Sequence, residues 1–569
     1  MAALSKRAVD YYAALPPELR SAETDRNRAL ALVRYGAALR TQSKLDESQK
    51  ALSDAVGVLG RLRKEGDQSE ATAIGLGVGL VTEARVAGSS NRRPEERELV
   101  KQGVDVLKPL MAAPNPSIPL RRAYGLAMTY LGFSQANNNQ EEAAVKTLED
   151  AREAYRSIDN LKLDDLPAAV AYSEASGWQI AALQALGRFD RVREVGADAV
   201  RVTGQVLEKR PGNMSALRAR ALIADTLSTT EGFDLHLRKA LALSEQGARD
   251  WEAIVALDPT NQIAWNNLVN ARLGSGFWAL GLGDIRRAQE EWRAALAVER
   301  HVKESGMIGV VLSLASGYLA MLEADSGNRQ AAETAMAANR RFIELAVRGL
   351  PPDAFSRSYL PELLGNYGYP GTGSGYGAYA LPYAAGDYET VRKEARASAP
   401  RLEQAKNVTP EQDLNRNRVL EAAYRTAAEA SYRLKDYAAA DLEIKRALET
   451  HRAIPMRTLA EERDASEQLM LAAMIAARLE RYAEAQQIIE PVLKFHRGLY
   501  ARGKDNEDLR QHVEFAQALY VSALAAPGQK AAQLTQAAFI MDNLPPAMRR
   551  LTSNTVWRDW IAEEQKTRH

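Results

Sequence analysis

Histidines are the first residues to test for chemistry, because they serve as metal ligands and as general bases. The chain has six of them, His236, His301, His451, His496, His512 and His569. A helical zinc site needs two histidines within a few residues of each other, as in His-Glu-x-x-His, and no pair here has that spacing. The sequence therefore predicts no metal site, and we expect each histidine to be a packing or surface residue.

Other catalytic patterns are equally weak. The adjacent acids Asp164-Asp165 and Glu461-Glu462 stand among Arg and Lys on helical segments, which is typical of a solvated face. The glycines of Gly371–Gly377 alternate and match neither the dinucleotide-binding nor the P-loop pattern. A Gly-x-Ser-x-Gly nucleophile elbow is also missing from the sequence. We expect no cofactor and no enzymatic activity.

Composition narrows the class of protein further. The 569 residues include no cysteine, which excludes disulfides and thiolate metal sites. Lys and Arg number 74 against 73 Asp and Glu, so the net charge is +1 and no basic excess favours nucleic acid. The best candidate for a membrane span is the uncharged stretch 306–322, but it is short for one and keeps the register of the chain's repeats, so we expect a buried helix. We expect a cytoplasmic protein.

The elements that would position any site repeat about every 48 residues. Small or apolar residues mark the repeat at Ser48, Leu99, Ala144, Val192, Ala240, Ala288, Ala332, Val391, Ala440, Ala485 and Ala531. After each tight turn, apolar residues follow at spacings of three and four, as in Ile285-Ala288-Trp292-Ala295, and so share one helix face. A period of this length indicates a stacked array in which each helix pair needs its neighbours to bury its apolar face.

Turn residues separate the expected helices. Glycine stands at Gly187, Gly283, Gly327 and Gly386, and Lys435 takes the same place in one repeat. Glycine accepts the left-handed conformation that ends a helix, and a following Asp or Asn can cap the next one.

These features resemble tetratricopeptide repeats. The resemblance rests on Asp-Tyr-x-x-Ala, on Leu257-Asp258-Pro259, and on a glycine twelve residues before the repeat residue, as in Gly36, Gly132 and Gly276. The standard repeat has about 34 residues, so this chain is similar to the longer-helix arrays at the C-terminal ends of multidomain bacterial signalling proteins. The resemblance implies an all-α, right-handed superhelical solenoid of about eleven helix pairs that binds a protein or peptide in a concave groove.

Two places interrupt the array. The interval from Ala332 to Val391 is 59 residues and contains a Pro-, Gly- and Tyr-rich stretch that cannot be a regular helix. The second follows Pro545-Pro546, where a helix with Val556, Trp557, Trp560 and Ile561 could cap the last repeat. We therefore predict one solenoid half over 1–349, a seam loop over 350–390, and a second half with a capping helix over 391–569.

Candidate partner-binding residues come from two sources. Counting back from the repeat residues along the resemblance places Phe133, Phe277, Arg425, Tyr432, Met470 and Met474, together with Arg40 and Tyr520, on the groove face. The seam contributes a tyrosine cluster, Tyr367, Tyr369, Tyr376, Tyr379 and Tyr383. Either set could contact a partner or pack between neighbouring repeats.

The first functional hypothesis is a protein-interaction or sensing module of a bacterial-type signalling or defence system, coupled to an effector upstream or associated with it. The alternative is a structural scaffold or oligomerisation module with no triggering ligand. An enzyme whose site is hidden among the helices is a third reading, which the lack of motifs disfavours. The partner and the oligomeric state do not follow from the sequence.

Overall fold

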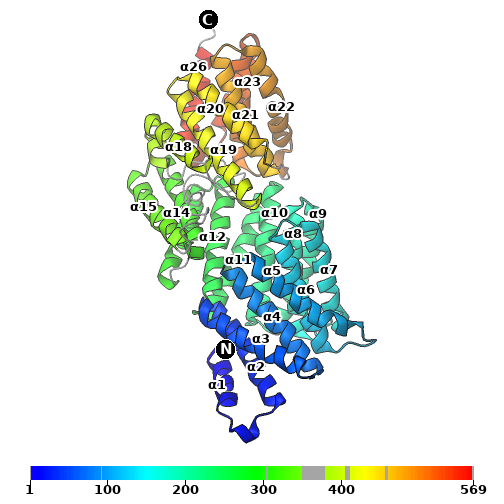
Figure 1. Cartoon of the computed structure of the whole chain (residues 1–569). Helices are drawn as coiled ribbons and strands as arrows, with labels where there is room; N and C mark the ends of the chain where they lie inside the picture. The colour runs from blue at the N-terminus through cyan, green and yellow to red at the C-terminus, as the bar shows by residue number, and fades with distance from the viewer. Residues whose placement is uncertain are drawn as a thin grey trace. The chain divides into compact units, whose positions relative to one another are not determined.

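The computed structural model describes residues 2–90, 92–302, 306–348, 379–403, 410–454 and 459–566. All regular elements of these ranges are helices, which confirms the all-α prediction (Figure 1). The chain divides into two compact units, residues 1–230 with 246–267, and residues 231–245 with 268–569. The predicted seam at 350–390 falls within the second unit.

Unit 1 begins with α1 (Ala2–Ala13) and continues with antiparallel helix pairs stacked side by side (Figure 1). The pairs are α2 (Ala22–Thr41) with α3 (Leu45–Lys64), α4 (Glu70–Ser89) with α5 (Arg93–Leu107), α6 (Ile118–Ala136) with α7 (Glu141–Asp159), and α8 (Leu166–Ala185) with α9 (Phe189–Lys209). The first helices of successive pairs also contact one another, from α2 through α4 and α6 to α8. They form the inner layer, as the resemblance implied.

The division between the units passes through three helices, α10 (Met214–Phe233), α11 (Leu237–Leu257) and α12 (Gln262–Gly281). Unit 2 then contains α13 (Ile285–Leu296), α14 (Gly306–Asp325), α15 (Arg329–Arg348), α17 (Ala380–Ala384), α18 (Tyr388–Glu403), α19 (Pro410–Arg433), α20 (Tyr437–His451), α21 (Leu459–Arg478), α22 (Tyr482–Ala501), α23 (Leu509–Ala525) and α24 (Lys530–Asp542). It ends with α25 (Pro546–Arg549) and α26 (Thr552–Lys566). From α2 to α24 the described residues form eleven helix pairs, the number expected.

The turns adopt the predicted backbone. Gly187, Gly283, Gly327 and Gly386 have φ between 70° and 81°, and Lys435 has φ of 62°. Aspartates then cap the next helix, because Asp284 accepts a hydrogen bond from the backbone nitrogen of Arg287 (3.1 Å) and Asp436 from that of Ala439 (3.2 Å).

The repeat residues are buried where the sequence places them, with two corrections. Nine of the eleven, from Ser48 to Ala485, have no exposed surface. Leu99 is only partly buried and Ala531 is exposed, and the buried side chains near them include Glu96, Val100 and Leu534. With Glu96 in place, six successive repeat positions from Ser48 to Ala288 lie 48 residues apart. Glu96 is charged, so a repeat pattern defined by small or apolar residues does not include it.

The glycine twelve residues earlier has a packing role. A methyl group at Gly36, Gly132 or Gly276 would approach Leu52, Leu148 or Trp292 to 2.6, 2.4 and 2.4 Å, respectively. Each of these large side chains stands one helical turn after its repeat residue, so only glycine allows it to pack at this depth.

One helix in the described ranges, α14, has an 18-residue apolar window, Ile308–Asp325, of the length and composition that could cross a membrane. Within the structure 78% of that window is buried. A core helix passes the same test, and α14 packs between its neighbours as the register of the repeats predicts.

Candidate binding pocket

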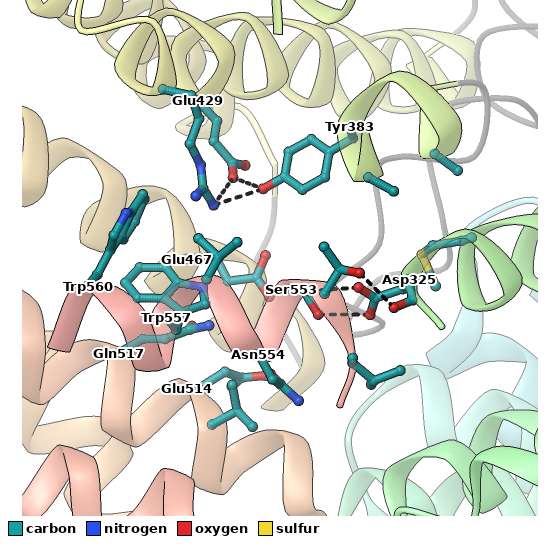
Figure 2. Close-up of a pocket in the computed structure, with 18 of the residues that line it drawn as sticks. Asp325, Tyr383, Glu429, Glu467, Glu514, Gln517, Ser553, Asn554, Trp557 and Trp560 are labelled. Carbon is teal, nitrogen blue, oxygen red and sulfur yellow. Dashed lines mark hydrogen bonds and ion pairs between the residues drawn. The ribbon is translucent and has the colours of Figure 1, made fainter. Parts of the chain in front are cut away.

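Unit 2 encloses a cavity of about 540 Å³ on the inner side of its helices (Figure 2). Its walls come from the inner helices α14, α19, α21 and α23, from the short α17, and from the C-terminal α26. A cavity of this volume is in the range that holds a small ligand or a few side chains of a peptide.

One wall is a cluster of aromatic rings carried by α26. Trp557 and Trp560 stand three residues apart, so both project from the same side of the helix into the pocket (Figure 2). The Trp560 ring lies 6.2 Å from the Tyr520 ring with planes 23° apart, and the Arg433 guanidinium lies over the Trp560 ring at 4.1 Å. Aromatic and cation–π contacts of this kind are worth about 0.5–2 kcal/mol each, so they hold α26 against α19 and α23.

The beginning of α26 is held by a residue of another repeat. Asp325, the last residue of α14, accepts hydrogen bonds from the backbone nitrogen and the hydroxyl of Ser553 at 2.7 and 2.8 Å (Figure 2). The backbone oxygen of Asp325 also accepts from the Thr552 hydroxyl at 3.0 Å. A carboxylate at this place satisfies backbone groups that a helix N-terminus leaves open. Thus α26 covers the last helix pair, as predicted for a cap, and also forms a wall of the inner cavity.

A polar cluster of Tyr383, Glu429 and Arg433 adjoins this aromatic wall. The Tyr383 hydroxyl donates to Glu429, and Arg433 donates to the Tyr383 hydroxyl at 3.0 Å and to Glu429 at 3.3 Å (Figure 2). Burial raises the pKa of Tyr383 well above its ordinary value. The hydroxyl therefore stays neutral and acts as a fixed hydrogen-bond donor rather than as a base.

Two carboxyls lie deeper. Glu467 pairs with Arg425 at 2.5 Å, and Glu514 accepts from Arg463. Burial raises the pKa of both carboxyls, although the neighbouring arginines favour their charged forms. In an enzyme such a pair could divide the roles of acid and base. Here each carboxyl is occupied by an arginine, so the arrangement is suited to charge-specific binding.

Ser466, His496 and Glu514 lie in the order of a hydrolase triad. The Ser466 hydroxyl is 2.8 Å from His496 Nε2, and His496 Nδ1 is 3.7 Å from Glu514. The Ser466 hydroxyl, however, donates to the backbone oxygen of Arg463 at 2.7 Å, so His496 Nε2 must be its donor. In that tautomer histidine cannot take the serine proton. Ser466 and His496 are buried and do not line the cavity, so they belong to a core network of which only Glu514 reaches the cavity.

The pocket brings together part of the predicted site. Tyr383, Arg425, Tyr432, Met470 and Met474 line it. Tyr379 is instead buried against α18 and α19 in a core cluster with Val391, Ala395, Ala427 and Ala430. Tyr367, Tyr369 and Tyr376 lie outside the described residues.

Four predicted groove residues do not line this pocket: Arg40 and Phe133 belong to unit 1, and Phe277 and Tyr520 to unit 2. Phe133 belongs to unit 1, where its ring packs on Trp178 at 4.5 Å. Phe277 is in unit 2 but packs under Arg510 (4.7 Å) and beside Trp278 and Tyr318. Both therefore make packing contacts within the array, and a role for either in partner binding stays a prediction.

Sequence reasoning missed Asp325, Glu467, Glu514, Trp557 and Trp560 as lining residues. The tryptophans were recognised only as the apolar stripe of a cap. The signal that could have found them is that one terminal helix carries two tryptophans, which is more aromatic surface than capping one repeat requires. The acids gave no local signal, because their role depends on contacts with other repeats.

No family model matches the chain, and no curated protein matches it. Solved structures with similar helical arrays include the human IFIT1 dimer with PPP-AAAA (TM-score 0.37, 14% identity, covering 92% of this chain and 94% of that one). Yeast Tom70 (0.31, 13%, 95% and 96%) and the APC/C hetero-tetramer Cut9-Hcn1 (0.27, 12%, 96% and 98%) are two others. At these scores the likeness concerns the helical-repeat architecture and carries no argument about function.

Proposed function

We propose that this protein is a cytoplasmic interaction module whose unit 2 pocket binds a peptide segment of a protein partner. The observation that supports the proposal most is the lining of the 540 Å³ cavity, where two tryptophans, tyrosines and methionines stand beside paired charges. Aromatic side chains, Met and Arg are the residue types that dominate interaction hot spots.

The apolar and the charged residues that line the pocket have different roles in binding the peptide. Trp557, Trp560, Met470 and Met474 offer apolar surface for one or two anchoring side chains of the peptide. The pairs Arg433–Glu429 and Arg425–Glu467 present both signs of charge, so they can select the polar groups that flank the anchors. Apolar anchors give affinity, and the charges give specificity.

We further propose that this binding is coupled to an effector in a bacterial-type signalling or defence system. This part of the proposal rests on the sequence resemblance, and on the property of stacked repeats that small rotations between neighbours add along the array. A scaffold with no triggering ligand is the alternative, and in that case the pocket would bind no peptide specifically.

Panning the full chain with a phage-displayed library of random dodecapeptides tests the proposal. Recovered peptides are synthesised with a fluorophore and titrated by anisotropy against wild type, Trp557→Ala and Glu467→Gln. We expect at least a tenfold weaker affinity for both variants. The matched control is Leu442→Ala, because this side chain is 68% exposed and does not line the pocket. Unchanged affinity in both pocket variants would reject this function.

A further inference from the structure

Unit 1 carries a row of polar side chains on its inner helices that the pocket of unit 2 does not involve. Arg40, Arg85, Tyr130, Glu174 and Arg218 come from α2, α4, α6, α8 and α10, one from each successive pair. They are spaced by 45, 45, 44 and 44 residues. Because this spacing is shorter than the 48-residue repeat, the row crosses the inner layer diagonally.

The only carboxylate of the row is already used. Glu174 accepts from Arg218 at 3.0 Å and from the Tyr130 hydroxyl at 3.0 Å. Burial alone would raise the pKa of Glu174, but Arg218 and Arg85 outweigh it and lower the pKa. Glu174 is therefore ionised, and its charge is balanced by Arg218.

Two guanidinium groups remain in excess. Arg85 stacks over the Tyr130 ring at 4.4 Å, and neither Arg85 nor Arg40 forms an ion pair with any carboxylate in the described ranges. The Nε atom of Arg40 is buried and has no acceptor there. Burial, together with repulsion from Arg85, lowers the pKa of Arg40 to about 9. The row therefore lacks a negative partner for these two arginines. Because leaving such a cation unbalanced is costly, a bound anion would be stabilising here.

The two unpaired arginines are within reach of an anion from solvent, because Arg40 and Arg85 are both only partly buried. The neighbouring pair Arg218 and Glu174 also has 31% and 19% of its side-chain surface exposed. Trp178 stands one helical turn after Glu174 on the same face of α8, and its indole nitrogen is buried without an acceptor. Together with Phe133, which packs on Trp178, it places an apolar surface next to the excess charge.

We propose that Arg40 and Arg85 form a binding site for an Asp or Glu side chain in an acidic peptide segment of a partner. A guanidinium group pairs with a carboxylate through two parallel hydrogen bonds, and two such groups can hold one carboxylate firmly. Phe133 and Trp178 take an apolar residue of the same segment. The site deepens the proposed interaction function, but it lies in unit 1 and does not depend on the pocket of unit 2.

A nucleic-acid backbone is disfavoured as the occupant. Phosphate groups follow one another along such a strand, and neutralising several of them requires a continuous basic surface. The row offers two unpaired cations and then the ionised Glu174, which would repel the next phosphate. An isolated acidic side chain meets no such conflict.

The test uses the full chain and a fluorescein-labelled, C-terminally amidated peptide with one acidic side chain, Phe-Glu-Ala-Phe, titrated by anisotropy at low and at physiological salt. Arg40→Gln and Arg85→Gln should each weaken binding by tenfold or more. Glu174→Gln should strengthen binding severalfold, because it frees Arg218 while keeping an acceptor for Tyr130. The control Arg61→Gln, an exposed arginine on α3 paired with Asp25, should leave the affinity unchanged.

Because Glu174→Gln is expected to raise the affinity and the arginine variants to lower it, the test stays valid even if one arginine variant is poorly folded. Equal affinity of the peptide for wild type, Arg85→Gln and Glu174→Gln would overturn the proposal. Binding of a single-stranded oligoadenylate or of inorganic phosphate with no binding of the peptide would also overturn it. Trp557→Ala must leave this peptide's affinity unchanged, which separates the failure of this site from failure of the pocket in unit 2.

Discussion

Asp325 and Ser553, which stand 228 residues apart, are joined by two hydrogen bonds of 2.7 and 2.8 Å. One comes from the backbone nitrogen of Ser553 and the other from its hydroxyl. The contact fixes the beginning of α26 on the end of α14, and so fixes the helix that carries Trp557 and Trp560 into the pocket.

This relationship predicts a coupled effect on stability. Ser553→Ala should cost about 1 kcal/mol because it removes one hydrogen bond at a helix N-terminus, and Asp325→Ala should cost more because it removes both. In a double-mutant cycle measured by urea unfolding, the two should couple by about 1 kcal/mol. Ser157→Ala is the control, since this exposed hydroxyl bonds only within its own helix. Strictly additive effects would mean that the two residues do not act together.

The aromatic wall predicts a second effect. Trp560→Ala should lower the free energy of unfolding by about 2–3 kcal/mol, because it removes the stacking on Tyr520 and the cation–π contact with Arg433. Phe539→Ala removes an aromatic side chain that is 62% exposed and should be nearly neutral. Equal effects of the two substitutions in chemical denaturation would contradict the packing of α26 described here.

Glycine packing gives a third prediction. Gly132→Ala should destabilise by about 1–3 kcal/mol, because the added methyl group would stand 2.4 Å from Leu148. Gly204, in the C-terminal half of α9, has no neighbouring atom within 4 Å of the position of an added Cβ, so Gly204→Ala should stabilise by about 0.5–1 kcal/mol. Opposite signs in thermal unfolding confirm the packing rule, and a stabilising Gly132→Ala would refute it.

The sequence predicts the architecture well because the repeat is a local property. Turn glycines, caps and helix periodicity specify each pair, and the common period specifies the stacking. It predicts five of the lining residues, and four of them, such as Tyr432 and Met474, follow from their place on the inner helices of the array. The rest of the pocket could not be predicted, because α26 contacts α14 and α19 through side chains far away in sequence. Glu96 escaped detection because a charged residue can occupy a buried repeat position when Arg93 pairs with it at 2.8 Å.

A buried acid in unit 1 predicts a dependence of stability on pH. Burial raises the pKa of Asp225 to about 7, against 3.8 ordinarily, although Trp251 donates a hydrogen bond to it at 3.4 Å. The folded state therefore binds the proton more tightly than the unfolded state, and stability contributed by this group is lost as pH rises from about 4 through 7.

Asp225→Asn should remove this part of the pH dependence. At pH 8 the variant should be more stable than wild type by about 2–4 kcal/mol, and at pH 4 the two should be nearly equal. Urea unfolding at both pH values measures the difference. Asp105→Asn is the control, because this side chain is 57% exposed and pairs only with Lys101. Parallel pH profiles of wild type and Asp225→Asn would show that Asp225 is not the titrating group.

The central claim, that a peptide occupies the pocket of unit 2, is tested most directly by site-specific photo-crosslinking. The photoreactive amino acid p-benzoylphenylalanine replaces Gln517, which lines the pocket, in one variant and the exposed Leu442 in another. Each is irradiated with a peptide selected on the wild-type protein, and adducts are identified by mass spectrometry. We predict an adduct at position 517 that excess unlabelled peptide suppresses, and none at position 442. An adduct at 442, or no suppressible adduct at 517, would contradict the account.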